Sequence, residues 1–169
     1  LLYAGTTPLD TIPAGMIERV EVIEGGQALF YGTQAVAGAI NIVTKAFANK
    51  PDGAISIAAD SNTGKHADGY ARDAVGKNQF VVYLSGDKSE GFQPFRDQDY
   101  QPSGTDHRRA YDVLTLGLKY AYNFTDDVRL SADEQHTSAK LDYAYPYQIA
   151  TKFNERSEDL LTMKLDAKF

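Results

Sequence analysis

The feature that most constrains this chain is an alternation of apolar and polar residues that recurs over most of its length. The segment 109–122 shows it clearly, because its apolar positions are Leu114, Leu116, Leu118, Tyr120 and Tyr122. Thr115, Gly117 and Lys119 fall between them. A period of two residues places successive side chains on opposite faces of a β-strand. The segment is therefore predicted to be a strand with one apolar and one polar face.

The same pattern predicts further strands on both sides of this segment. The predicted strands cover residues 17–23, 39–43, 53–60, 65–75, 79–87, 109–122, 128–139 and 158–169. Their connections differ in length: 76–78 and 123–127 are short, whereas 88–108 and 145–157 are long. Short turns at one end, long loops at the other and aromatic residues at strand ends (Tyr120, Tyr122, Phe169) are typical of an outer-membrane β-barrel.

Alternation by itself fits a soluble antiparallel sandwich as well as a barrel. Lys, Asp and Arg on the polar faces suit a water-filled lumen, and strands of ten or more residues exceed the usual length of about 5–6 in soluble sheets. Six strands after residue 46 cannot close a membrane barrel, which needs at least about eight. From the pattern alone, either the chain is an incomplete part of a transmembrane barrel, or it is not a barrel.

Composition excludes several other classes of protein. The 169 residues contain no cysteine, so neither disulfides nor thiolate metal sites are expected. A net charge of −6 without a basic tract argues against a nucleic-acid partner. No apolar run approaches the roughly 20 residues of a transmembrane helix. The chain opens Leu1-Leu2-Tyr3 without a signal peptide, which we take as a sign of truncation.

No catalytic or cofactor-binding motif stands out. There is no G-x-S-x-G element and no phosphate-binding loop. His66, His107 and His136 lie far apart and lack metal-ligand spacing. Glu18 and Glu21 are three apart on a predicted strand, so they should point to opposite faces and not act as a catalytic pair. We expect no enzymatic activity, no catalytic residue, no metal and no cofactor.

The segment 17–45 carries the most specific signal in the chain. It reads I-E-R-V-E-V-I-E-G-G-Q-A-L-F-Y-G followed by T-Q-A-V-A-G-A-I-N-I-V-T-K. This order and spacing resemble the plug domain of TonB-dependent outer-membrane receptors. The segment 2–9 resembles, more weakly, the element that precedes it in the family. Gly26 stands where the family often has proline, Glu24 where a basic residue is common, and Ala37-Gly38 where two glycines are usual.

The resemblance implies a fold and a division into domains. We expect a mainly β chain in which a partial plug domain, α/β or mostly β, is followed by about six antiparallel strands of an incomplete transmembrane barrel. Residues 1–46 would be the C-terminal part of the plug and residues 47–169 the N-terminal part of the barrel. Gly25, Gly26, Gly32 and Gly38 would permit plug turns that are closed to residues with a Cβ atom.

The resemblance also implies an ion pair between plug and barrel at Arg19. A permanent charge inside a plugged lumen needs a partner, and plug arginines in this element of the family pair with glutamates of the barrel wall. The alternative is that Arg19 pairs locally with Glu18, Glu21 or Glu24.

The long loops are candidate ligand contacts. They carry aromatic rings beside charged groups, namely Phe92, Phe95, Arg96, Tyr100, Tyr145 and Tyr147. Such residues could bind a siderophore, a corrinoid or a sugar by stacking and charge pairing. Ordinary surface loops with interfacial tyrosines explain them equally well.

By this resemblance the chain is part of an active transporter in the bacterial outer membrane. It would take up a scarce ligand, by default an iron–siderophore, with vitamin B12, other metals and oligosaccharides open. Its partners would be outer-membrane lipid and the TonB energy-transducing complex, reached through a TonB box that is absent from this chain. The alternative is a soluble β-rich ligand-binding module without transport activity, which would not depend on detergent.

Overall fold

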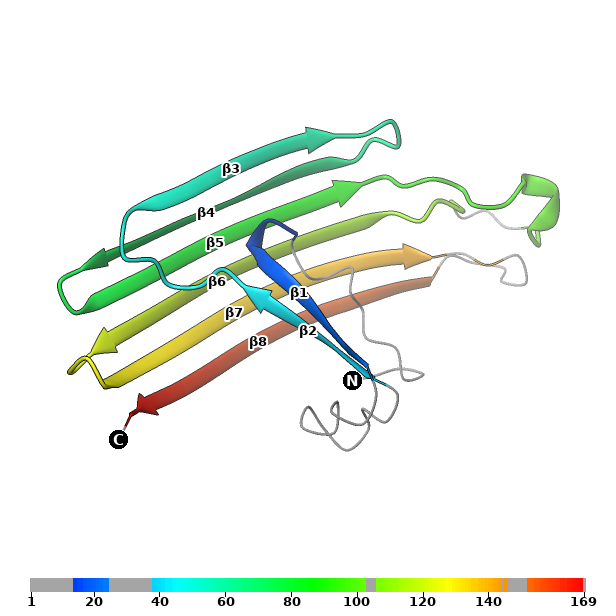
Figure 1. Ribbon diagram of the computed structural model, residues 1–169. Helices are drawn as coiled ribbons and strands as arrows, with labels where there is room; N and C mark the ends of the chain where they lie inside the picture. Colours follow the sequence, from blue (N-terminus) through cyan, green and yellow to red (C-terminus); the bar gives the residue numbers. More distant parts are fainter. Residues whose placement is uncertain (1–13, 25–37, 103–105, 144, 146–151, 169) are drawn as a thin grey trace.

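A computed structural model describes residues 14–24, 38–102, 106–143, 145 and 152–168. Two sheets contain all of the described strands (Figure 1). The smaller pairs β1 (Ile17–Glu24) with β2 (Gly38–Thr44), and a single turn of 3-10 helix, η3 (Ala14–Met16), precedes it. The larger sheet consists of β3 (Asp52–Ala59), β4 (Lys65–Val75), β5 (Asn78–Ser89), β6 (Tyr111–Asn123), β7 (Val128–Tyr143) and β8 (Lys152–Ala167).

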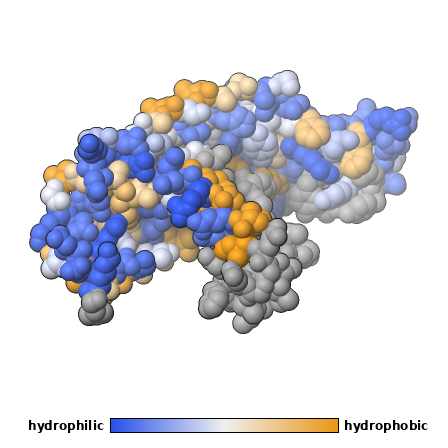
Figure 2. All heavy atoms as spheres, viewed as in Figure 1, coloured by the Kyte–Doolittle hydropathy of each residue, from blue (hydrophilic) through white to orange (hydrophobic). Residues whose placement is uncertain are grey.

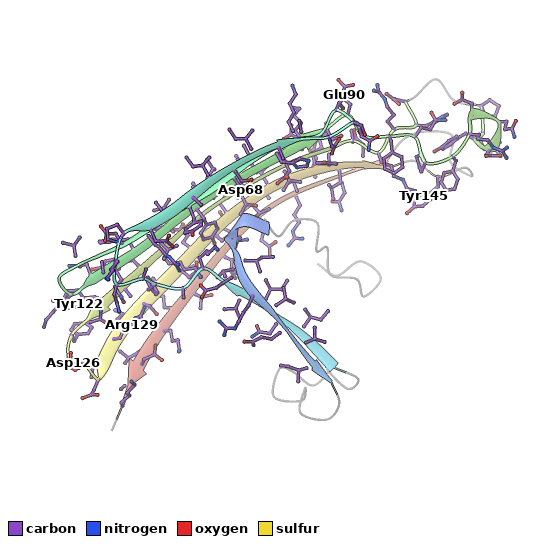
Figure 3. All side chains as sticks on the ribbon, turned by 45° about the horizontal axis from the view of Figure 1, so that its top comes forward. Asp68, Glu90, Tyr122, Asp126, Arg129 and Tyr145 are labelled. Carbon is purple, nitrogen blue, oxygen red and sulfur yellow. The ribbon has the colours of Figure 1, made fainter. Side chains whose placement is uncertain are left out.

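The six-stranded sheet is a continuous antiparallel meander. Its strands follow one another in sequence order, so β3 and β8 form its two edges. The sheet is curved, and the β1–β2 hairpin meets its concave side at the η3 end and projects away from it (Figures 1 and 3). This arrangement confirms the predicted fold class, a mainly β chain with an open run of about six strands. Among the described residues, no helix is both long and apolar enough to cross a membrane.

The two faces of the sheet differ as the alternation predicts. On β5 and β6 every second side chain is buried, and these buried residues face the hairpin: Gln79, Val81, Tyr83, Ser85, Val113, Thr115, Lys119 and Ala121. Figure 2, which looks onto that face, shows hydrophilic residues predominating over the sheet. The opposite, convex face carries exposed apolar side chains, among them Val82, Leu84, Leu114, Leu116, Leu118, Met163 and Leu165.

The ends of β7 and β8 differ from the prediction. The sequence pattern ended the fifth barrel strand at 139 and began the sixth at 158, whereas the strands pair without a break from Val128↔Ala167 to Tyr143↔Lys152. No single face of this extension is apolar, because Lys140 and Asp142 alternate with Leu141, which lies on the face opposite to that of Leu114. The apolar positions therefore change face along β7, and the pattern no longer marks one continuous strand, although the backbone ladder continues. The predicted loop 145–157 is correspondingly shorter.

The short and long connections fall at opposite ends of the sheet, as predicted. Tyr122, Asp126 and Arg129 mark the end with short turns, while Glu90 and Tyr145 mark the end with long connections (Figure 3). The β4–β5 turn uses Gly76 at a φ of 59°, a conformation that favours glycine. At the other end Asp60 caps its own turn, since its Oδ1 accepts from the backbone N–H of Asn62 (2.7 Å) and of Gly64 (3.0 Å).

Candidate functional site

The hairpin is anchored to the sheet by one buried side chain. Met16, at the end of η3, is 4% exposed and packs against Val81 (0%) and Tyr83 (3%) on β5. Phe47 and Tyr70 close around this cluster. The backbone holds the same point, because Lys45 N–H donates to the Met16 carbonyl at 2.8 Å. The start of β1 and the exit from β2 are thereby fixed together above β5.

Arg72 of β4 connects the hairpin to the wall through charge. Its guanidinium contacts Asp52 at 2.7 Å and Glu18 at 3.7 Å, and donates to the Ala46 carbonyl at 3.0 Å. Glu18 in turn accepts from the Ala46 N–H at 2.7 Å. That backbone hydrogen bond, with the nearby positive charge of Arg72, lowers the pKa of Glu18 below its usual value.

A second set of polar contacts joins β2 and the segment after it to the middle of the sheet. The ammonium of Lys119 donates to the Thr44 hydroxyl and pairs with Asp133 at 3.1 Å. Gln79 donates to Asn49 at 2.9 Å. Lys119 is largely buried, so this pairing satisfies a charge that would otherwise be costly on the inner face.

Aromatic rings complete the contact. The guanidinium carbon of Arg129 lies 4.4 Å from the centre of the Phe47 ring, and the Lys45 ammonium lies 4.7 Å from that of Tyr70. Both distances are within the range of a cation–π interaction. The concave face of β4–β7 therefore holds the hairpin through one apolar anchor surrounded by charged groups.

Arg19 pairs locally in the described part of the chain. Its Nε donates to Glu21 at 2.7 Å, and Glu21 also accepts from Asn41 at 2.8 Å. This is the local alternative that the sequence left open. The hairpin-to-wall ion pair within the described residues is Glu18–Arg72 instead. An Arg19 pair with a barrel glutamate is tested by none of these contacts and stays a prediction.

Sequence reasoning missed the role of Arg72. The alternation of 65–75 places Arg72 on the polar face together with Tyr70, but it carries no information about what lies over that face.

Of the predicted turn glycines, Gly38 begins β2 opposite Glu24. Gly25, Gly26 and Gly32 lie outside the described residues, so their role in plug turns stays a prediction.

The long β5–β6 connection folds around its own aromatic residues. Tyr100 is 7% exposed and stacks on His107, with ring centres 4.0 Å apart, and Phe95 meets it edge-on at 5.9 Å. The Arg109 guanidinium lies 5.3 Å from the Tyr145 ring and 6.0 Å from Phe95. Two long connections are thus joined through one cation.

The other candidate ligand contacts lie on the surface of this cluster. Phe92, Phe95 and Arg96 are exposed, and Arg96 pairs with Asp99 at 3.2 Å. Arg108 holds Asp106 at 2.7 Å and, through this contact, lowers the pKa of that carboxyl. Tyr147 lies outside the described residues. The structure thus brings Phe95, Tyr100 and Tyr145 together, whereas Phe92 and Arg96 are not joined to them by a ring contact.

The three histidines remain apart. His66 contacts Asp87 at 2.5 Å and Asp60 at 3.4 Å, His136 contacts Asp159 at 2.6 Å, and His107 stacks on Tyr100. Across the described ranges no group of three or more His, Cys, Asp or Glu residues is placed to hold a metal ion.

Comparison with known proteins defines the class. Residues 2–39 match the TonB-dependent Receptor Plug Domain family. Together with the hairpin seated on a curved antiparallel sheet, this match places the chain in the family of TonB-dependent outer-membrane receptors. The predicted family and bacterial outer-membrane localisation are confirmed. The expectation that the chain is not an enzyme is also confirmed, since these receptors are transporters.

Within this family the chain is similar to vitamin B12 transporters. It is 30% identical over 140 residues to the vitamin B12 transporter BtuB of Vibrio vulnificus strain CMCP6, covering 83% of this chain and 22% of the relative. BtuB of Vibrio cholerae serotype O1 strain M66-2 is 25% identical over 167 residues, covering 98% of this chain and 26% of the relative. The chain thus spans about a quarter of the length of the curated relatives it matches.

Proposed function

We propose that this chain forms the C-terminal part of the plug (1–46) and the first wall strands (47–169) of a TonB-dependent active transporter. The observation that carries the proposal is the hairpin seated on the concave face through Met16 and the Glu18–Arg72 pair. A plug that is held by contacts of this kind can be displaced without unfolding the wall. The boundary near residue 46 is supported by Ala46, whose backbone is held from both sides by Glu18 and Arg72.

The proposed ligand is vitamin B12, or a corrinoid close to it. The support is the name that the relatives share, vitamin B12 transporter. The default from family frequency alone, an iron–siderophore, has no such support among these relatives and serves as the competing candidate. Phe92, Phe95, Arg96, Tyr145 and Tyr147 are proposed as ligand contacts, and Tyr100 as the ring that holds the loop in shape.

The proposed energy source is the TonB complex, which would act through a TonB box outside this sequence. No covalent step on the ligand is needed, because transport requires only binding, plug displacement and release. The convex apolar face would lie in outer-membrane lipid, with the long connections outside the cell.

Uptake by the full-length protein that contains this segment tests the proposal. It would be expressed in a bacterial host whose own vitamin B12 receptor is deleted, and uptake of radiolabelled cyanocobalamin would be compared with uptake of a ferric siderophore. We expect cobalamin uptake in a host with TonB and none in a TonB-deleted host. Siderophore uptake alone would reassign the ligand, and detergent-independent ligand binding without uptake would favour the soluble binding module.

A matched pair of variants tests the loop. Phe92→Ala removes an exposed ring, and Gln98→Ala removes a polar side chain from the same connection. We expect the first to weaken cobalamin binding about threefold to tenfold, in line with about 0.5–1.5 kcal/mol for an aromatic contact, and the second to leave it unchanged. If both variants changed cobalamin binding equally, Phe92 would not be a ligand contact.

A further inference from the structure

The convex face of the sheet contains a furrow that follows β4. The outward positions of β4 are small, Ala67, Gly69 and Ala71, whereas both neighbouring strands present large apolar side chains. Ile55 and Ile57 on β3 are 85% and 81% exposed, and Val82 and Leu84 line the opposite side. The hollow between them measures about 400 Å³ and is lined mostly by apolar surface.

The furrow continues along the strand in both directions. Toward the short turns a second hollow of about 570 Å³ shares Ala71 and Val82 with the first. In the other direction Ala67 pairs with Gly86, at which an added Cβ would meet nothing within 4 Å. From residue 67 to 73 an extended strand covers about 20 Å. A groove of this length can hold one acyl chain.

Two lysines stand at the end of the furrow near the long connections. Lys65 begins β4 and is the direct register partner of Lys88 on β5. Like charges placed directly opposite each other destabilise a sheet, so folding alone does not account for this pair. Lys88 contacts Asp112 at 2.6 Å, whereas Lys65 forms no ion pair with any residue that the structure describes.

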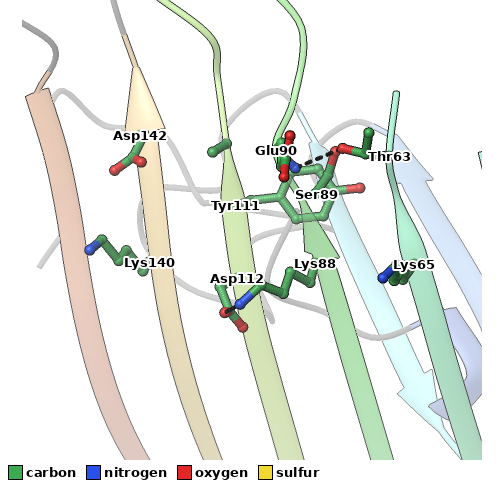
Figure 4. A pocket seen from close by; sticks show the side chains of 10 residues that line it. Thr63, Lys65, Lys88, Ser89, Glu90, Tyr111, Asp112, Lys140 and Asp142 are labelled. Carbon is green, nitrogen blue, oxygen red and sulfur yellow. Dashed lines mark hydrogen bonds and ion pairs between the residues drawn. The ribbon is translucent and has the colours of Figure 1, made fainter. Parts of the chain in front are cut away.

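The lysines border an open hollow of about 370 Å³ (Figure 4). Figure 4 shows Lys88 reaching Asp112, with Lys65 on one side and Lys140 on the other. The carboxylates that also line this hollow are Glu90 and Asp142. Glu90 pairs with Arg108 at 3.0 Å. Asp142 is on β7, three strands and therefore about 14 Å from Lys65 on β4. This distance exceeds the screening length of about 8 Å at physiological salt, so Asp142 does not neutralise Lys65.

We infer that this part of the convex face binds an outer-leaflet lipid whose phosphate gives it a net negative charge. The phosphate contacts the ammonium groups of Lys65 and Lys88, and one acyl chain lies in the furrow along β4. Positive charge and apolar groove meet at Ala67 and Gly86, so a single amphiphile satisfies both. The inference rests on the proposed function, which places the convex face in the outer membrane and the long connections outside.

The test uses the full-length protein in detergent micelles. Lipid binding would be titrated by native mass spectrometry with lipid A, phosphatidylglycerol, zwitterionic phosphatidylethanolamine and inorganic phosphate. We expect lipid A or phosphatidylglycerol to bind at least about tenfold more tightly than phosphatidylethanolamine, because each offers the two lysines a net negative charge. The tighter of these two lipids identifies the source of the phosphate.

Two pairs of variants test the head-group contact and the acyl-chain groove separately. Lys65→Gln with Lys88→Gln should lower affinity for the phosphate lipid about tenfold, whereas Lys50→Gln with Lys168→Gln, which removes the same charge at the opposite end of the sheet, should not. Gly86→Leu should narrow the furrow and weaken lipid binding without changing the charge. Ala132→Leu, at an outward position on β7, is its control.

The outcomes distinguish this inference from the proposed function. Equal affinity for phosphatidylethanolamine, or the same loss in both lysine pairs, would overturn the phosphate contact. Inorganic phosphate binding as tightly as the lipids, or no effect of Gly86→Leu, would overturn the acyl groove. Insertion and cobalamin uptake are measured separately: a protein that inserts and transports but shows no lysine dependence loses only the lipid site.

Discussion

At the scale of single residues, the inner face depends on close fits that involve glycine. Tyr83 and Gly117 are register partners on β5 and β6, and the Tyr83 ring lies over Gly117. A Cβ at position 117 would fall 1.9 Å from the ring, while the Tyr83 hydroxyl donates to Gln135 at 3.1 Å. The ring therefore occupies the space that a side chain at position 117 would need.

Gly117→Ala should accordingly displace Tyr83 and break its hydrogen bond to Gln135. We expect a loss of about 1–3 kcal/mol in the free energy of unfolding, the usual cost of overpacking. Urea unfolding of the full-length protein in lipid vesicles measures it. Gly86→Ala is the control, since an added Cβ there meets open space. If the two variants were equally stable, the fit between Tyr83 and Gly117 would not matter.

Docking of the hairpin also depends on one apolar residue, Met16. Met16→Ala empties a buried position beside Val81 and Tyr83, and such truncations cost about 2–5 kcal/mol. Because the loss falls on the contact between hairpin and wall, we expect proteolysis of the plug to accelerate while the wall stays protected. Uniform protection of both parts would contradict the anchoring role.

The Glu18–Arg72 pair should respond to acid. The backbone N–H of Ala46 and the charge of Arg72 lower the pKa of Glu18 below its ordinary 4.5. A carboxyl whose pKa is lower in the folded state stabilises that state fully above pH 4.5 and loses its contribution as pH falls below it. Glu18 is partly exposed, so the effect should stay below about 1 kcal/mol.

Measuring plug proteolysis between pH 7 and pH 3 tests this. The native protein should show a greater loss of protection below pH 4.5 than Glu18→Gln, which lacks the titrating group. Parallel pH profiles for the two proteins would mean that Glu18 does not contribute to docking.

At the scale of elements, each strand of the wall has two different surroundings. The central convex positions of β6 are Leu114, Leu116 and Leu118, whereas the concave positions between them are buried beneath other protein groups. In the proposed orientation Leu116 faces lipid near the middle of the apolar band. Leu116→Arg should therefore cost about 2–4 kcal/mol, the range for arginine near the bilayer midplane.

Urea unfolding in vesicles measures this cost as well. Ser56→Arg, an exposed position on the concave side of β3, places the same charge toward the lumen and should cost much less. Equal costs on both faces would argue against lipid on the convex side.

At the scale of the whole molecule, the described sheet is open, and its edges β3 and β8 present unpaired backbone groups. In lipid each unpaired group costs several kcal/mol, so a stable wall requires further strands. We expect this 169-residue segment, expressed alone, not to insert into vesicles as a monomer, whereas the full-length protein does. Protease protection in vesicles distinguishes the two, and protected insertion of the segment alone would contradict an open-edged wall.

The sequence by itself determined the strands, their faces, the side on which the long connections lie and the family. A period of two follows from local backbone geometry, so it can be read wherever one face is apolar, as in 79–87 and 109–122. It failed at 140–143, where the apolar position Leu141 falls on the other face, and at 152–157, where the run is mostly polar, so that only the ladder extends the strands. The plug motif was readable because its residues are contiguous.

Only the tertiary structure decided which side chains meet. Glu18 and Arg72 are far apart in sequence, and neither pattern nor composition relates them. Glu18, and not its neighbour Arg19, meets Arg72 of β4, whereas Arg19 pairs with Glu21 on its own strand. Tyr100 is buried by its own loop. Contacts of this kind depend on strand register and on docking, and both are decided by the combined free energy of many residues. Alternation, by contrast, is a property of each strand alone.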